Sequence, residues 1–406
     1  MTFRLLFPVI AFVLAHSSAV AQSTASLDDV NDAVAFLAGM ELPHRTDHPL
    51  ANSSSWKNHA EQLDREFASH QERVLFPMSK WSGEEVVPPE GDKASRPVVR
   101  YMFSGPDILH AYYMFPQAET YILCGLEPVG ELPGIAELNA GNAGRALGEV
   151  RTALGEVINF SFFRTADMKD DLQFAVFRGT TPILSIFLAR AGQYIKGIEF
   201  SVLGSDGKLT GQGMESAGAN VVKIEFSPRR VGKNKTLYYF SSNLYDSEFD
   251  NTGFRTWLDA QPPGFAYLKA ASFLMHGDNF TKIRQHLLDQ SFQIVQDDSG
   301  IPYRYFDGTI WYADLWGNYT GPIDLFAQFY QPDLRAGFRG RSMELPFGTG
   351  YKWRKNESNL MRFLKQSYQA PTAEDEVTTV PTSEIEATTE APVPEKESAT
   401  APSEGL

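Results

Sequence analysis

The chain has 406 residues and a formal net charge of −14 at pH 7, and it is long enough to bury an ordinary hydrophobic core. Nine acidic residues and one lysine follow residue 368, and the mildly acidic remainder argues against nucleic acid or an anionic membrane as a partner. The single cysteine, Cys124, excludes an internal disulfide.

Residues 1–21 have the pattern of a secretory signal peptide. Arg4 provides a basic start, Leu5–Leu14 is apolar, and Ala19-Val20-Ala21 fits a cleavage site of small residues. The apolar run is short for a membrane span, and no later stretch reaches that length. We therefore expect an exported protein, secreted or periplasmic, with no membrane span in the mature chain.

Residues 22–97 are predicted to form helices and a loop that belong to one domain with the body, residues 98–368. Amphipathic spacing indicates one helix over Leu27–Leu37 and another over roughly Trp56–Leu75. This part of the chain contains four histidines, His44, His48, His59 and His70. No carboxylate completes a known metal-binding pattern with them, so we predict that they are surface or structural histidines and that there is no metal site.

The stretch Val98–Gly130 predicts a strand, a tight loop, a helix and a second strand. Val98–Phe103 is β-branched and aromatic, Ser104–Asp107 contains residues that end strands and cap helices, and Thr120–Cys124 is again apolar. A connection of this length favours a parallel strand pair with a right-handed crossover. Cys124 is predicted to be a buried small hydrophobe, because no basic group near it in sequence would form a thiolate.

Polar residues follow both predicted strands, where ligands bind in parallel sheets. Ser104 and Asp107 follow the first strand and Glu127 follows the second, so we expect all three at one edge of the sheet. The placement of Ser104 is typical of a hydrolase nucleophile, although the surrounding residues are not G-x-S-x-G. His110, on the helix face of Asp107, and His276, from elsewhere in the chain, are candidate bases. The alternative is purely structural: helix capping and loop closure.

The segment after Gly130 alternates between predicted helices and strands. Helices are expected at 146–160, 182–191, 254–258, 265–275 and 280–288, and strands at 195–203, 221–226 and 236–240. Because no helix separates those three strands, they predict an antiparallel part of the sheet. Asp297–Gly300 predicts a hairpin turn, and its paired aspartates are expected to shape that turn rather than to bind metal or transfer protons.

Aromatic residues are concentrated in Tyr303–Trp353. They predict either a β-rich flank of the core or a platform for a glycan, with Trp311, Trp316 and Trp353 as the candidate ligand-binding residues. Gln369–Leu406 is rich in Thr, Ser, Pro, Ala and Glu, and we predict an acidic disordered tail there.

The motifs of nucleotide, dinucleotide, zinc-protease, thiol-redox and calcium sites are missing from the sequence, so we predict no cofactor. The predicted fold class is α/β: a mixed sheet with a parallel β-α-β unit at 98–126, flanking helices and an antiparallel, aromatic-rich C-terminal part. Two functions stay open. The favoured one is a non-catalytic envelope or extracellular protein that binds a glycan or a protein. The alternative is a secreted hydrolase-like enzyme with its site around Ser104, Asp107 and Glu127.

Overall fold

The computed structural model describes residues 26–86, 97–132, 135, 139, 141–160, 179–229 and 232–367. These residues all belong to one compact unit, which ends at Gln369. The predicted signal peptide and the predicted acidic tail lie outside the described residues.

A ten-stranded mixed sheet organises the described part of the chain, in the order β4-β3-β5-β6-β2-β1-β7-β8-β10-β9. Its strands are β1 (Val98–Tyr101), β2 (Thr120–Gly125), β3 (Gln193–Leu203), β4 (Leu209–Gly213), β5 (Val221–Pro228), β6 (Lys235–Ser241), β7 (Gly264–Leu268), β8 (Ser291–Gln296), β9 (Trp311–Gly317) and β10 (Asn359–Lys365). The five central strands, from β6 to β8, run parallel, and antiparallel strands extend the sheet on both sides. The predicted α/β class with a mixed sheet is therefore confirmed.

The predicted β-α-β unit forms the middle of the sheet. β1 and β2 are parallel, with Val98 opposite Thr120 and Tyr101 opposite Leu123. The helix between them, α4 (Ile108–Met114), begins after Asp107, whose side chain caps it by accepting a hydrogen bond from the His110 N–H. Side chains of β1 alternate between the two faces: Tyr101 packs into one hydrophobic core and Val98 into the other.

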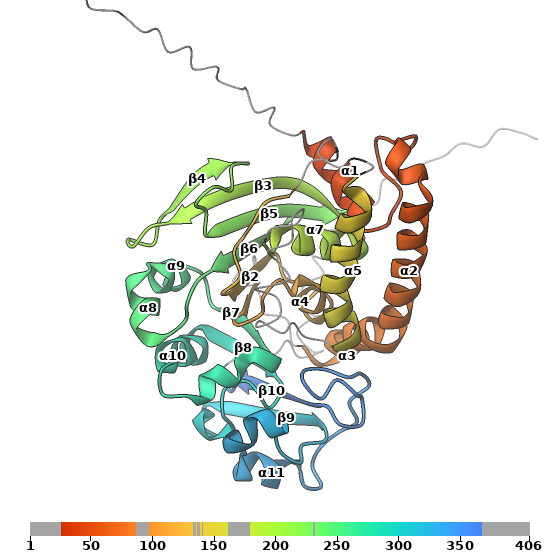
Figure 1. The fold of residues 1–406 in the computed structure, drawn as a ribbon. Helices are drawn as coiled ribbons and strands as arrows, with labels where there is room; N and C mark the ends of the chain where they lie inside the picture. The colour runs from red at the N-terminus through yellow and green to blue at the C-terminus, as the bar shows by residue number, and fades with distance from the viewer. Residues whose placement is uncertain are drawn as a thin grey trace, which may run out of the picture. The chain divides into compact units, whose positions relative to one another are not determined.

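Helices cover both faces of the sheet (Figure 1). One face packs against α1 (Leu27–Leu37), α2 (Ser54–His70), the π-helical turn η2 (Gln71–Leu75), α3 (Phe76–Glu85), α4, α5 (Ala143–Phe160) and α7 (Thr181–Arg190). The other packs against α8 (Asp246–Asn251), α9 (Phe254–Asp259), α10 (Thr281–Gln290) and α11 (Pro332–Phe338). Short 3₁₀ segments are η1 (Pro49–Asn52), η5 (Ala270–His276), η6 (Tyr303–Tyr305) and η7 (Asp324–Phe329). None of the described helices is long and apolar enough to cross a membrane.

Two predicted elements were wrong. The helix predicted over Phe265–Met275 is instead strand β7 followed by η5. A short, fully buried apolar run does not distinguish a parallel strand from a buried helix by periodicity. Asp297–Gly300 does not join a hairpin either: β8 pairs with β7 and β10, and the turn leads toward η6.

The chain changes direction across the sheet between β1 and β7. From β1 it moves to β2 and later to β6 on one side, and it then crosses back to β7 and β8 on the other side. The strand order therefore reverses at the carboxyl ends of β1 and β7. In open α/β sheets such a reversal is where the connecting segments diverge and leave room for a ligand.

Candidate functional site

Five chain segments meet at the carboxyl edge of the parallel strands. They are Phe103–Asp107 after β1, Leu126–Glu127 after β2, Ser242–Leu244 after β6, Lys269–Ala270 after β7 and Asp297–Ser299 after β8. Because the strands are parallel, the segments that follow them lie on the same edge. The predicted common edge for the residues after β1 and β2 follows directly from the observed pairing.

Backbone strain is concentrated at two points of this edge. Among the described residues other than glycine, Phe103 and Ala270 have positive φ, at 60° and 57°. One follows β1 and the other follows β7, on the two sides of the strand-order reversal. Non-glycine residues rarely adopt this conformation, and it clusters at functional sites. The strain marks the edge between these strands as the place to look for a site.

A sealed group of polar side chains lies at the reversal, and we call Tyr101, Asp107, His110, Lys269 and His70 the strand-end cluster. Asp107 is its centre. Its Oδ1 accepts a hydrogen bond from the His110 backbone N–H at 3.2 Å and lies 2.8 Å from His110 Nδ1. Its Oδ2 accepts from the Tyr101 hydroxyl at 2.9 Å and lies 2.9 Å from Lys269 Nζ. Asp107 is thus the N-cap of α4, and its carboxylate also reaches the ring of His110, three residues further along the chain.

Charges inside the strand-end cluster compensate for its burial. Burial raises the pKa of the Asp107 carboxyl, but the neighbouring His110 and Lys269 outweigh it and bring that pKa well below its usual value. Burial lowers the pKa of His110, and it lowers that of His70, whose Nε2 lies 3.2 Å from His110 Nε2. Asp107 and Lys269 side chains are 2% and 0% exposed. The charged groups therefore pair with one another and are not accessible to a substrate.

Ser104 does not meet a base in the described part of the chain. Its hydroxyl donates to the carbonyl oxygen of Gly105 at 2.8 Å and to that of Cys124 at 3.4 Å, and its side chain is buried. His276 packs against the rings of Phe273 and Phe329, with centroids 5.3 and 5.0 Å away. Burial lowers the pKa of His276 to about 4. The structure thus does not join these two candidates into a nucleophile and its base.

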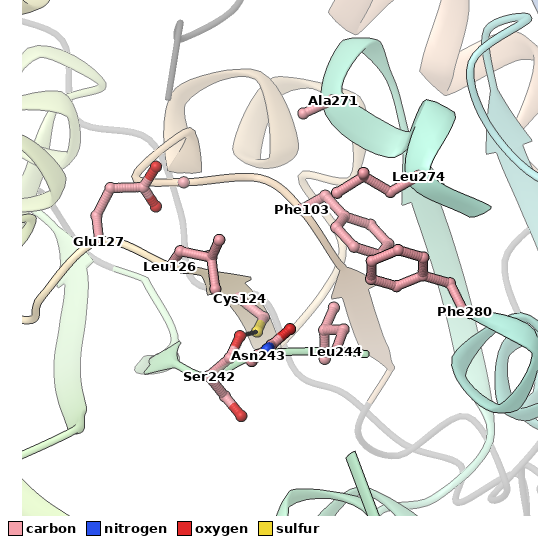
Figure 2. A pocket seen from close by; sticks show the side chains of 12 residues that line it. Phe103, Cys124, Leu126, Glu127, Ser242, Asn243, Leu244, Ala271, Leu274 and Phe280 are labelled. Carbon is pink, nitrogen blue, oxygen red and sulfur yellow. Dashed lines mark hydrogen bonds between the residues drawn. The ribbon is translucent and has the colours of Figure 1, made fainter. Parts of the chain in front are cut away.

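A cavity of about 170 Å³ opens at the same edge, beside the ends of β1, β2 and β6, and we call it the strand-end cavity (Figure 2). Apolar side chains form most of its wall: Phe103, Leu126, Leu244, Ala271, Leu274 and Phe280. Glu127 contributes a carboxylate, the one carboxylate among the described residues that line the cavity. An apolar cavity with a few placed polar groups is the usual form of a small-molecule site.

The carboxylate of Glu127 is held in place at the cavity wall. Glu127 is 2% exposed, and its Oε2 accepts a hydrogen bond from the Tyr239 hydroxyl at 3.2 Å. The same hydroxyl is 3.0 Å from the main-chain oxygen of Glu127. A Cβ at Gly125 would lie 2.3 Å from Oε2 and 2.8 Å from the Tyr239 hydroxyl, so glycine leaves the carboxylate and the hydroxyl the space in which they meet. The turn after β2 is therefore shaped around the carboxylate.

Cys124 lines the strand-end cavity without being reactive. Its thiol donates to the carbonyl oxygen of Ser242 at 3.5 Å, and burial raises the pKa of the thiol far above its usual value. A thiol that stays protonated is a poor nucleophile and a poor metal ligand. The side chain packs as a small hydrophobe, as predicted.

The paired aspartates after β8 also lie on this edge, where they organise the backbone. Asp297 accepts hydrogen bonds from the Ser299 N–H at 2.9 Å and the Ala270 N–H at 3.1 Å. Asp298 accepts from the Asn359 side chain at 2.8 Å. Burial and the nearby charge of Asp297 raise the pKa of Asp298 to about 7. The pair shapes a turn, although not the predicted hairpin.

The three candidate tryptophans do not form one platform. Trp316 is buried against Trp81, with ring centroids 5.0 Å apart, and Trp311 is also buried. Trp353 is half-buried, with the Arg354 guanidinium 4.6 Å from its ring centroid. Trp311 does line an open groove of about 350 Å³ together with Tyr305, Asp307 and Lys365. Two buried indoles leave little ring surface for stacking on a sugar.

Sequence reasoning did not identify three members of the strand-end cluster as site residues: Lys269, Tyr101 and His70. Lys269 directly follows β7, the strand that was predicted as a helix, so its position at a strand end could not be seen. The signal that could have revealed it is Gly264–Leu268, a short apolar run after two prolines. Within the described residues, no group of three or more His, Cys, Asp and Glu could hold a metal ion.

Comparisons with protein-family models, with curated proteins and with solved structures find no match for this chain. The fold defines this chain as an α/β protein with an open mixed sheet and a cavity at the carboxyl ends of its parallel strands. That cavity is the starting point for its function.

Proposed function

We propose that this protein is an exported, non-catalytic binding protein that holds a small ligand in the strand-end cavity. The observation that carries the proposal is the buried carboxylate of Glu127 in the wall of an apolar cavity of about 170 Å³. Burying a carboxylate is costly unless it has hydrogen-bond partners. The Tyr239 hydroxyl is one such partner, and a donor group on a bound ligand would be a second. Export rests on the signal-like pattern of residues 1–21.

The geometry supports binding better than hydrolysis. An acyl-transfer site needs a nucleophile within reach of a base, and that pair is absent from the described residues around Ser104. Asp107 and His110 do form a close pair, but both are sealed inside the strand-end cluster. A binding site needs only a shaped cavity and a polar anchor, and the strand-end cavity has both.

A carbohydrate ligand is a second candidate, supported by the groove at Trp311. That groove brings an indole together with Tyr305, Asp307 and Lys365, a mixture of apolar and hydrogen-bonding groups that suits a sugar. However, Lys365 Nζ lies 5.2 Å from the Trp311 ring centroid, and two arginines lie over Tyr305. These cations occupy the ring faces on which a sugar would stack, so we favour the strand-end cavity.

Filling the strand-end cavity tests the proposal. Purified protein is screened by ligand-observed NMR against a panel of small fragments, each with at most about ten non-hydrogen atoms. Hits are expected with the unchanged protein, and they should disappear in Ala271→Phe, because the added ring occupies the cavity. Ala327→Phe makes the same change at an exposed position of η7 and should keep the hits.

The screen has two outcomes that would overturn the proposal. One is that no fragment binds the unchanged protein. The other is that fragments bind equally well to Ala271→Phe, which would place them elsewhere on the molecule. Thermal unfolding of both variants shows whether each is folded before its binding is compared.

A further inference from the structure

We infer that the ligand of the strand-end cavity is a single-ring molecule that carries a hydroxyl or amino group, with the ring packed against the phenylalanine pair and the group on Glu127. This inference rests on the proposed function and names the ligand class for it. It follows from three properties of the cavity: its size, the shape of its apolar wall and the position of its carboxylate.

The size of the cavity limits the ligand to about one ring. Its volume is about 170 Å³. For comparison, an apolar protein cavity of about 150 Å³ is filled by one benzene molecule. A six-membered ring with one or two small substituents therefore fits, whereas a long acyl chain or an oligosaccharide would extend out into solvent.

The apolar wall favours a flat body. Phe103 and Phe280 lie with ring centroids 5.7 Å apart and ring planes at 74°, and both line the cavity (Figure 2). Such a pair exposes the edge of one ring and the face of the other, and aromatic ligands gain from both contacts. Leu126 and Leu274 complete the wall and are also partly open to solvent, 48% and 46% exposed. A flat apolar ring would cover this leucine surface.

The strained backbone fixes the aromatic part of the wall. Phe103 is held at a φ of 60° between β1 and Gly105, whose own φ is 52°. A non-glycine residue at positive φ persists only when surrounding structure holds it there. Here the strain turns the chain at the end of β1, where the Phe103 ring lines the cavity and meets the Phe280 ring.

The carboxylate selects the polar group of the ligand. An ionised carboxylate only accepts hydrogen bonds, so the partner must be a donor such as a hydroxyl or an amine. Tyr239 donates to Oε2 of Glu127. The carboxylate has further acceptor sites, and Glu127 lies in the cavity wall. A buried polar group discriminates strongly against ligands that leave it unpaired.

Two probes that differ in one hydroxyl test the inference: 4-methylphenol and toluene. Their affinities for the purified protein are measured by calorimetry. We expect 4-methylphenol to bind about tenfold or more tightly than toluene, because its hydroxyl donates to a buried charged acceptor. 4-Methylanisole, which has the ring and the oxygen but no donor, should bind no better than toluene.

The variant Glu127→Met removes the acceptor while keeping the volume of the side chain. Tyr239 keeps the main-chain oxygen of residue 127 as its partner, so the variant leaves that hydroxyl satisfied. The preference for 4-methylphenol over toluene should fall to one or below, because its hydroxyl would then be buried without an acceptor, and toluene should bind at least as well as before. Glu248→Met, at an exposed position of α8, is the matched control and should keep the preference.

The outcomes separate this inference from the proposed function. The inference is overturned if both probes bind the unchanged protein equally, if the preference persists in Glu127→Met, or if neither probe binds while other fragments of the panel do. In those cases the cavity still binds ligands and the proposed function stands. If no fragment of the panel binds at all, the proposed function fails and the inference fails with it.

Discussion

The two sides of the carboxyl edge show that a carboxylate at a strand end can have opposite uses. At the ends of β1 and β7, Asp107 is enclosed by Lys269, His110 and Tyr101, and its charge is compensated inside the protein. At the end of β2, Glu127 has a tyrosine hydroxyl on one oxygen and lies in the wall of a cavity. The strand-end cluster thus has the composition of an active site but is closed, whereas the strand-end cavity has few polar groups but is open.

This difference separates stability from binding. A buried ion pair is costly to break because removing one partner leaves an uncompensated charge. A carboxylate in the wall of a cavity is instead available to accept a hydrogen bond from a ligand that enters the cavity. Substitutions in the strand-end cluster are therefore expected to change unfolding, and substitutions around the strand-end cavity to change ligand binding.

Lys269→Met should be the most destabilising of these changes. It leaves the Asp107 carboxylate buried without its ammonium partner, at an expected cost of about 3–5 kcal/mol in the free energy of unfolding. Urea denaturation at pH 7 measures this cost. The double variant Lys269→Met/Asp107→Asn should recover part of it, because no charge is then left unpaired. A loss below about 1 kcal/mol for the single variant would show that the pair is not the main support of the edge.

Asp298→Asn should change how stability depends on pH. The pKa of Asp298 is raised from 3.8 to about 7, so between these values the folded state holds a proton that the unfolded state has released. Stability from this group is therefore lost as the pH rises from about 4 through 7. The variant keeps the hydrogen bond from Asn359 and should exceed the unchanged protein by about 2–4 kcal/mol at pH 8.

At pH 4.5 the advantage of the same variant should shrink to about 1 kcal/mol, because this pH is less than one unit above the ordinary pKa of the aspartate. Urea denaturation at the two pH values gives the comparison. Equal stability of the two proteins at pH 8 would mean that Asp298 ionises in the folded state at no cost.

Ser104→Ala should have the smallest effect. It removes a hydroxyl that donates to two carbonyl oxygens, and the expected loss in the free energy of unfolding is about 1 kcal/mol. Ligand binding in the strand-end cavity should be unchanged. Hydrolysis of 4-nitrophenyl acetate is the sharper measurement: any rate above background that the variant loses would make Ser104 a nucleophile and would favour the enzyme hypothesis over the binding protein.

The sequence predicted the part of the edge that depends on local pattern. Val98–Phe103 and Thr120–Cys124 are β-rich runs separated by a short helix, and that order by itself implies parallel neighbours with their ends together. It also placed Asp107 and His110 on one side of the predicted helix; in the structure Asp107 is the N-cap of α4, and its carboxylate reaches the His110 ring. Local spacing is sufficient for contacts made within one element or one connection.

The tertiary structure decided what those residues could do. Lys269 and Tyr101 reach Asp107 from β7 and β1, and Tyr239 reaches Glu127 from β6, contacts whose partners lie up to 162 residues apart in the chain. Burial of the two indoles was likewise set by packing and not by their spacing: Trp316 packs against Trp81 of α3, and Trp311 packs against Phe306 on the other face of the sheet. Sequence periodicity reports which face of an element is apolar, but it does not report which distant element covers that face. Whether a polar group at a strand end is buried or accessible depends on the distant element that packs over it, and only the folded chain brings that element into place.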